Sequence, residues 1–98
     1  NHTLAPETTA VQGPRADALQ DRSMRRLDTA RQWLDRDSIT ADDLMALTRE
    51  PDAVCQTAVE PYHVESSGAT VMRPRTKEFW AVWGLPSMNE YQKVPFAR

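Results

Sequence analysis

Apolar residues between positions 21 and 36 recur every three or four residues, and charged residues fill most of the positions between them. Met24, Leu27 and Leu34 form this stripe, and Trp33 lies beside it. That spacing gathers the apolar side chains on one face, because an α-helix turns once in about 3.6 residues. We therefore predict an amphipathic helix that ends near position 36.

A second helix is predicted over residues 41–49. Thr40 can cap its free amides and Asp43 stands at the third helical position, which is the arrangement of a capping box. Pro51 ends the helix soon afterwards, because proline disfavours helical conformation in the residue before it. Only a few residues join the two helices, so we predict that residues 21–50 form a helical hairpin.

Residues 1–20 begin without a helical pattern. They are rich in threonine, alanine and proline, with Pro6, Gly13 and Pro14 as helix breakers. An extended segment followed by a loop is predicted here.

Residues 51–98 carry the signals of β-strands. Two runs, 69–72 and 77–83, are rich in β-branched and aromatic residues and flank a turn-rich connection at 73–76. A β-hairpin is predicted from this arrangement. The tail is predicted to be extended, and Pro95 favours an edge position because proline cannot donate a hydrogen bond to a neighbouring strand.

The second predicted strand carries apolar groups on both faces. Phe79, Ala81 and Trp83 point one way, whereas Trp80 and Val82 point the other. Strands of this kind are covered on both sides. A chain of 98 residues has too few residues to pack against both faces of this strand, so a missing partner is expected.

The composition is that of a folded protein, with 40% apolar and 27% charged residues. Together with the order of elements it predicts one α+β segment over residues 1–98, a helical hairpin followed by antiparallel strands. The formal net charge of -2 argues against nucleic acid and anionic membranes as partners. No apolar run approaches the roughly 20 residues that span a bilayer. The single cysteine, Cys55, excludes an internal disulfide and agrees with a cytoplasmic location.

No complete active site is visible in the sequence. His2 and His63 lack the spacing of a metal-binding motif, so no metal is predicted. Cys55 and His63 could act as thiol nucleophile and base, but their flanks do not resemble an activated site, and a buried structural cysteine is the preferred interpretation. The glycines stand alone without a phosphate-binding loop, so no cofactor is predicted.

The chain begins at Asn1 without a methionine. A protease, a self-cleavage event or an artificial boundary would each produce such a start. We expect the chain to be one piece of a larger, processed enzyme.

Several short motifs occur in the order found in a known enzyme family. They are Asn1-His2, Ser23-x-x-Arg26, Ile39-Thr40-x-Asp42-Asp43-Leu44-Met45-Ala46-Leu47, Val54-Cys55, Ala69-Thr70-Val71-Met72, Phe79-Trp80-Ala81-Val82-Trp83-Gly84-Leu85-Pro86 and Tyr91. In these motifs the chain resembles the carboxy-terminal part of the acyl-coenzyme A:6-aminopenicillanic acid acyltransferase family, which belongs to the cysteine N-terminal-nucleophile hydrolases. The resemblance spans nearly the whole chain, and its strength lies in collinearity.

The resemblance implies an αββα sandwich, of which this chain forms the carboxy-terminal portion, and self-cleavage just before a catalytic cysteine. In the family that cysteine attacks an amide or thioester, with its own α-amine as base. It lies upstream of the matched region, so we expect a companion chain of the same precursor to carry it. Cys55 matches a later, non-nucleophilic cysteine position. The implied substrates are small-molecule amides or acyl thioesters, and no cofactor is implied.

Two positions become site candidates through this resemblance. Asn1 matches an asparagine that helps to hold the oxyanion in related enzymes, a role that suits a side-chain amide because it donates hydrogen without titrating. The alternative is that Asn1 has only a structural role. Arg26 matches a helix arginine that can bind substrate by orienting a carboxylate or a carbonyl. Arg25 is the alternative in a register shifted by one, and a surface salt bridge is the alternative role.

We therefore expect a subunit of a self-processed amidohydrolase or acyltransferase that works through an acyl-enzyme, with the nucleophile on a partner chain. The competing hypothesis is a non-catalytic protein-interaction domain that docks through its aromatic strand, using Trp80 and Trp83.

Overall fold

The computed structural model describes residues 2–14, 17–51, 53–60 and 63–96. Its helices are α1 (Pro6–Thr9), α2 (Asp17–Leu34) and α3 (Ala41–Thr48), and its strands are β1 (Gly68–Arg73), β2 (Glu78–Trp83) and β3 (Gln92–Lys93). The strands form one antiparallel sheet in the order β1-β2-β3. The predicted α+β class is therefore confirmed for these residues.

A short helix, α1, lies where no helix was predicted. Pro6 occupies its first turn, a place where the missing amide hydrogen costs nothing because that group has no helical partner. The Ala10 amide closes the turn on the carbonyl of Pro6 at 3.0 Å. The prediction of an extended segment and loop over residues 1–20 was wrong at this point, since proline can start a helix as well as break one.

The predicted apolar stripe of the long helix α2 faces the rest of the chain only in part, because Leu27 lines a cavity on the inner side of the helix. Met24 and Leu34, two members of the predicted stripe, are exposed, with relative accessibilities of 47% and 43%. Ser23 is the one buried residue of the helix. The helix also begins at Asp17, earlier than predicted, with that carboxylate in the first turn where the helix dipole favours it. Within the described part of the chain, no helix is both long and apolar enough to cross a bilayer.

The capping box predicted for α3 is present. The Asp43 amide donates to Thr40 Oγ1 at 3.1 Å, and the Thr40 amide donates to Asp43 Oδ2 at 2.9 Å. The hydrogen bond from the Thr40 amide lowers the pKa of Asp43, because it favours the ionised carboxylate. The helix starts at Ala41 as predicted and ends at Thr48, one residue early.

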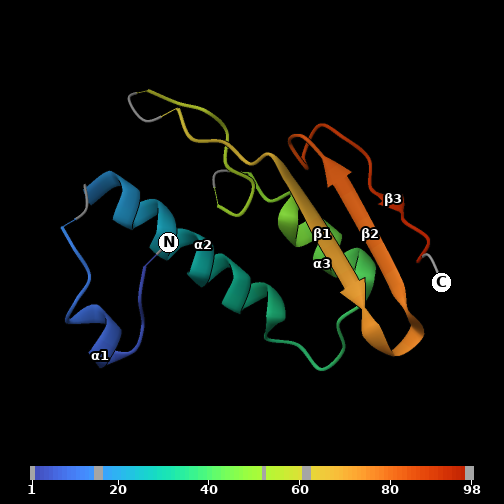
Figure 1. Ribbon diagram of the computed structural model, residues 1–98, viewed down its shortest axis with the longest axis horizontal. Coiled ribbons are helices and arrows are strands. Elements are labelled where there is room, and N and C mark those ends of the chain that lie inside the picture. The colour runs from blue at the N-terminus through green and yellow to red at the C-terminus, as the bar shows by residue number, and fades with distance from the viewer. Residues whose placement is uncertain (1, 15–16, 52, 61–62, 97–98) are drawn as a thin grey trace.

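The two main helices do not pack on each other as the predicted hairpin. Of the described elements, α3 packs against β1, and α2 is not among its close neighbours. Figure 1 shows α3 behind β1, with α2 lying to the left of the sheet. The buried residue of α3 is Leu47, and the helix packs on the sheet through β1.

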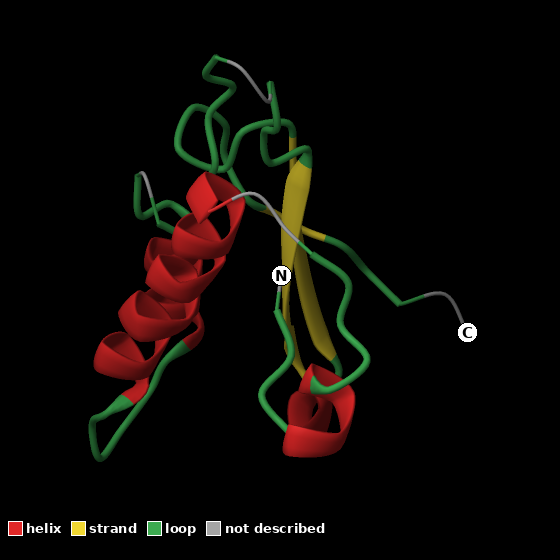
Figure 2. Cartoon of the chain, turned by 90° about the vertical axis from the view of Figure 1, so that its left-hand side faces the viewer, coloured by secondary structure: helices red, strands yellow, loops and turns green. Residues whose placement is uncertain are grey.

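The predicted β-hairpin is confirmed with a defined register. Val71 pairs with Trp80 and Ala69 with Val82, and a short 3-10 helix, Pro74–Thr76, connects the two strands. The short strand β3 adds to the other side of β2, where Lys93 pairs with Trp80. Figure 2 shows the sheet nearly edge-on, with the long helix α2 to one side of it.

The two faces of the sheet differ strongly in exposure. On the face toward α3, Val71 and Val82 are buried at 5% and 4% relative accessibility. On the opposite face, Met72 and Trp83 are exposed at 59% and 91%. Only Phe79 has an aromatic neighbour there among the described residues, an edge-to-face contact with Phe96 at 6.3 Å between centroids. The prediction that β2 is covered on both sides is therefore not met by the described residues.

The core that results is small. Among the described residues, its buried apolar members are Leu47, Ala53, Cys55, Val71, Val82 and Pro86. The radius of gyration is 15.5 Å, whereas a compact domain of this length has about 13 Å. The chain is thus more open than an ordinary domain, and the sheet face opposite α3, the bare face, is exposed at Met72 and Trp83 but half-covered at Phe79 and Ala81.

Candidate functional site

Two adjoining cavities lie along the inner side of α2. The Arg22 cavity, about 450 Å³ in volume, is lined by Leu19, Arg22, Arg26, Val54, Gln56, Val64, Glu65 and Ser66. The His2 cavity, about 410 Å³, is lined by His2, Leu4, Ser23, Arg26, Leu27, Ala30 and Val54. Arg26 and Val54 belong to both linings, so these two residues separate the cavities.

The helical repeat explains which residues of α2 line the cavities. Positions three and four apart lie on one face of a helix. Ser23, Arg26, Leu27 and Ala30 follow that spacing, and all four line the His2 cavity. The part of α2 that lines the His2 cavity therefore carries one hydroxyl and one guanidinium beside apolar groups.

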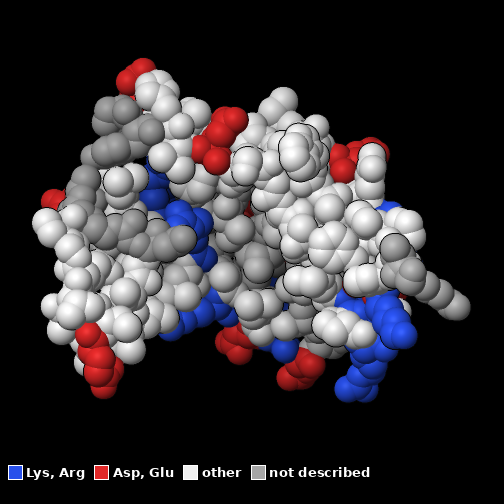
Figure 3. All heavy atoms as spheres, viewed as in Figure 1, with Lys and Arg blue, Asp and Glu red and all other residues white. Residues whose placement is uncertain are grey.

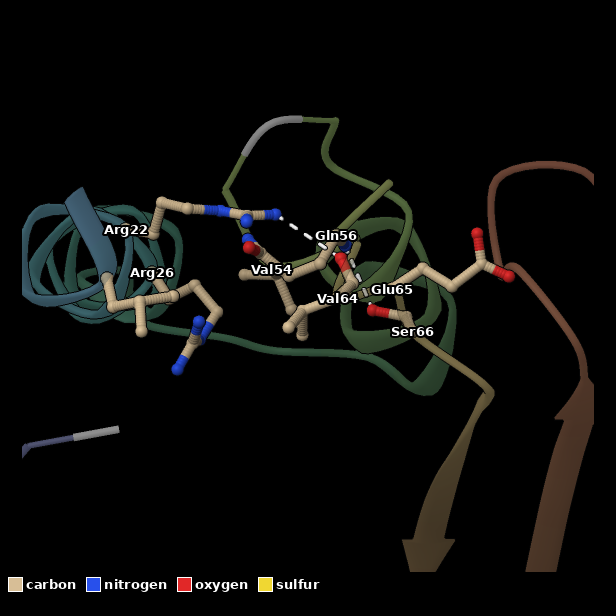
Figure 4. A pocket seen from close by; sticks show the side chains of 8 residues that line it. Arg22, Arg26, Val54, Gln56, Val64, Glu65 and Ser66 are labelled. Carbon is tan, nitrogen blue, oxygen red and sulfur yellow. Dashed lines mark hydrogen bonds between the residues drawn. The ribbon is translucent and has the colours of Figure 1, made fainter. Parts of the chain in front are cut away.

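The Arg22 cavity is closed on one side by hydrogen bonds between α2 and the loops before the sheet. Arg22 Nη2 donates to the carbonyls of Thr57 and Val64 at 3.3 and 3.4 Å. Figure 4 shows Arg22 reaching from α2 toward these loops, with Arg26 below it. The loops are themselves joined, since the backbone amide of Gln56 donates to Ser66 Oγ at 2.9 Å.

The His2 cavity is closed by the amino-terminal segment. His2 Nδ1 and Ser23 Oγ lie 2.8 Å apart, which joins this segment to the middle of α2. The next residue is fixed as well, because the amide and the hydroxyl of Thr3 both donate to Gln12 Oε1 at 2.9 Å. Two consecutive residues are thus anchored at the rim of the cavity.

Positive charge is concentrated where the cavities meet. Arg22 and Arg26 are both half-buried there, and each brings a guanidinium group to the recess. Glu65 lines the same cavity, but its carboxylate points away from the two guanidinium groups (Figure 4). Figure 3 shows lysine and arginine atoms gathered in a recess on this side of the molecule. Such a recess suits a carboxylate, a polarised carbonyl or an oxyanion.

The three predicted site residues do not share one location in the structure. Arg26 lies on the inner face of α2 at both cavities. Arg25 is exposed and lines a smaller, separate cavity of about 220 Å³ with Arg22, Thr57 and Val59. Asn1 lies outside the described residues. Of the two arginine registers, only Arg26 reaches the recess.

The residues predicted to have no catalytic role have ordinary surroundings. Cys55 is buried at 1% relative accessibility, and its Sγ lies 3.5 Å from Ser87 Oγ, which confirms the prediction of a buried cysteine. His63 pairs with Glu60 at 2.9 Å on the surface. Within the described ranges, no group of three or more potential ligands is arranged to hold a metal ion.

The contact between His2 and Ser23 was not predicted from the sequence. Both residues belong to motifs quoted above, but 21 positions separate them and no local pattern links them. Only the path of the amino-terminal segment back across α2 brings them together. The one signal that the sequence offered was a serine on a helix face whose other residues are apolar or charged.

No family model, curated protein or solved structure matches the chain. Its function must therefore be inferred from the cavities, the bare sheet face and the collinear motifs.

Proposed function

We propose that the chain is the carboxy-terminal subunit of a self-processed cysteine N-terminal-nucleophile amidohydrolase or acyltransferase. Its catalytic cysteine would lie on a companion chain of the same precursor. The substrate class is a small-molecule amide or acyl thioester. The buried, unpaired Cys55 is compatible with the cytoplasmic location expected for such an enzyme.

The observation that carries the proposal is the bare face of the sheet. Trp83 is 91% exposed and Met72 is 59% exposed, whereas the face toward α3 is buried. An αββα sandwich consists of two sheets packed face to face with helices outside, so a single sheet with a helix on one side is half of it. A second sheet from a companion chain would cover Met72 and Trp83.

The arginine recess supports a role in substrate binding. Arg26 can orient a substrate carboxylate or carbonyl, since its guanidinium offers several donors and lines both cavities. His2 lines the same recess. Asn1 precedes it in the chain and is the proposed donor to the oxyanion.

The proposed chemistry divides into two steps. The partner's cysteine sulfur attacks the substrate carbonyl carbon while its α-amine takes the thiol proton. The tetrahedral oxyanion is stabilised by hydrogen-bond donors, among them the side-chain amide of Asn1. The bond to the leaving amine or thiol then breaks, with return of the proton to the leaving group. Water or an acceptor amine finally attacks the thioester and releases the acyl group.

Mass spectrometry of the native assembly tests the proposal. The expected result is stable copurification with a chain whose first residue is cysteine, and labelling of that cysteine by iodoacetamide. A folded chain that purifies without any such companion would refute it. Within the assembly, Asn1→Ala should slow acylation by about 100-fold or more, the usual cost of losing one oxyanion donor. Unchanged acylation in an intact assembly would remove Asn1 from the site.

A non-catalytic interaction domain is the second candidate function. The same exposure of Trp83 favours it, because large exposed apolar groups mark docking surfaces. Trp80 does not belong to this surface, since Arg73 and Lys93 each lie 5.5 Å from its ring centroid on the other face. Mass spectrometry of the native assembly separates the two functions, because an interaction domain should copurify with a partner that has no amino-terminal cysteine.

A further inference from the structure

The hydroxyl of Ser23 and the imidazole of His2 have the geometry of a nucleophile and its base. Nδ1 and Oγ lie 2.8 Å apart, within the 2.6–3.2 Å range over which a side-chain base takes a proton directly. In the imidazole tautomer that carries its hydrogen on Nε2, Nδ1 accepts the hydrogen bond from the serine. Serine becomes an effective nucleophile in proteins when an adjacent base removes its proton in this way.

The pair also faces a space that can hold a substrate. Ser23 has only 3% relative accessibility, yet it lines the His2 cavity, so its hydroxyl is approached from that cavity. Apart from Arg26, the remaining walls are the aliphatic side chains of Leu4, Leu27, Ala30 and Val54. These walls suit a short apolar acyl chain.

A cation stands beside the pair. Arg26 lies three residues after Ser23 in α2, the spacing that puts two side chains next to each other on one helix face, and both line the His2 cavity. A guanidinium in this place can stabilise negative charge on a carbonyl oxygen attacked by the serine.

We propose that Ser23 and His2 form a second acyl-transfer site, acting on small carboxylic esters with an apolar acyl group. Ser23 Oγ forms a bond to the ester carbonyl carbon, and its proton passes to His2 Nδ1. The oxyanion collapses, the bond to the alcohol oxygen breaks, and the alcohol leaves with that proton. A water molecule then gives a proton to Nδ1 and attacks the acyl carbon. The bond to Ser23 Oγ breaks, Oγ regains the proton from Nδ1, and the carboxylic acid leaves. This site goes beyond the proposed function, because its nucleophile lies in this chain.

Among the described residues, none hydrogen-bonds to His2 Nε2, so no carboxylate orients the imidazole there. In serine hydrolases the loss of that third group lowers turnover by about 10⁴-fold. Slow turnover is therefore expected, and a single covalent labelling event is a better readout than steady-state hydrolysis.

The test is labelling of the natively purified chain, with any chain that accompanies it, by an alkyl fluorophosphonate. Ser23 Oγ would displace fluoride from phosphorus, with His2 taking the proton. Cleavage after aspartate releases the peptide 22–28, in which Ser23 is the single serine, so its mass locates the label. Pretreatment with iodoacetamide blocks a companion cysteine and should leave this label unchanged, which separates this site from the proposed function.

Three variants decide the outcome. Ser23→Ala should reduce labelling of peptide 22–28 to background. His2→Gln keeps a hydrogen-bond acceptor near Ser23 but not a base, and should slow labelling by about 100-fold or more. Ser87→Ala is the matched control, because Ser87 is also hydrogen-bonded, to Cys55, but lies outside both cavities. Labelling that persists in folded His2→Gln at the wild-type rate overturns the proposal, as does a folded wild-type chain that takes up no label at Ser23.

Discussion

The hydroxyl groups of Thr48 and Tyr91 lie 2.7 Å apart, although 43 residues separate them. This contact joins the last residue of α3 to the segment that leads into β3. Arg49 strengthens the junction, because its side chain donates to the carbonyls of Pro86 and Asn89 at 2.9 Å. The helix is thereby held against the sheet from its carboxy-terminal end.

Tyr91→Phe should lower the free energy of unfolding by about 1 kcal/mol. The substitution removes one part-buried hydrogen bond and keeps the ring, which lies 5.5 Å from the Arg49 guanidinium carbon. Urea unfolding of both forms measures the difference. A double-mutant cycle with Thr48→Val checks the assignment, since the two losses should not add if the hydroxyls bond to each other.

Stability should fall in acid through Glu78. Hydrogen bonds from Thr76 and then Lys93 lower the pKa of this carboxyl from 4.5 to about 2, because they favour its ionised form. A depressed pKa gives stability that is fully present above pH 4.5 and is lost as the pH falls toward about 2. Thermal unfolding between these limits should show a weaker pH dependence in Glu78→Gln. The exposed Glu90→Gln is the control, and an identical slope in wild type and Glu78→Gln would contradict the assignment.

Gly84→Ala should destabilise the end of β2 by about 1–3 kcal/mol. Gly84 has a φ of +81°, a backbone conformation that other residues rarely adopt, and a Cβ there would lie 3.0 Å from Asn89 Nδ2. Gly13→Ala is the matched control, because no atom lies within 4 Å of a Cβ built at that position. Equal urea midpoints for the two variants would show that the turn tolerates a side chain.

Arg26→Met and Arg25→Met should have different effects on substrate binding by the assembled enzyme. Loss of a charge-assisted hydrogen bond costs about 1.5–3 kcal/mol, so Arg26→Met should raise KM for a carboxylate-bearing substrate by about tenfold to hundredfold. Arg25 is exposed away from both cavities, and its substitution should leave KM unchanged. A larger rise in KM for Arg25→Met than for Arg26→Met would assign the binding role to Arg25.

Trp83→Ser should weaken assembly without weakening the fold. Trp83 is 91% exposed, so its loss should change the unfolding free energy of the chain by less than about 0.5 kcal/mol. As the most exposed aromatic residue of this face it should contribute at least about 2 kcal/mol to association, or roughly a 30-fold change in Kd. Val11→Ser, at a site 82% exposed but far from the sheet in sequence, serves as control in titrations of the companion chain. Equal Kd values for the two variants would exclude the bare face as the interface.

The elements that could be predicted from the sequence are those decided by neighbouring residues. Thr40 and Asp43 form the capping box because each finds its partner three residues away. The β1–β2 hairpin follows from alternation and a turn-rich connection, both local properties. The one-turn helix α1 was missed because it starts with a proline. Proline breaks a helix in its interior but is favoured in the first turn.

Packing and the candidate site could be predicted only in part. The pattern indicated Met24 and Leu34 as the inner face of α2, whereas both are exposed and Ser23 is buried. Periodicity gives the angle between side chains but not which face meets the rest of the chain. Arg26 was nominated through motif order, while its place between two cavities and the contact of Ser23 with His2 depend on tertiary structure.

Because Cys55 is almost completely buried, the reactivity of its thiol can be used to measure local unfolding of the chain. With 1% relative accessibility, the thiol can meet a reagent only when the residues around it move apart. Its modification rate, followed as denaturant or a companion chain is added, would therefore give the free energy of that local opening. Cys55 takes no part in the proposed chemistry, but its modification rate would thus measure how often the part of the chain that contains α3 and the sheet opens.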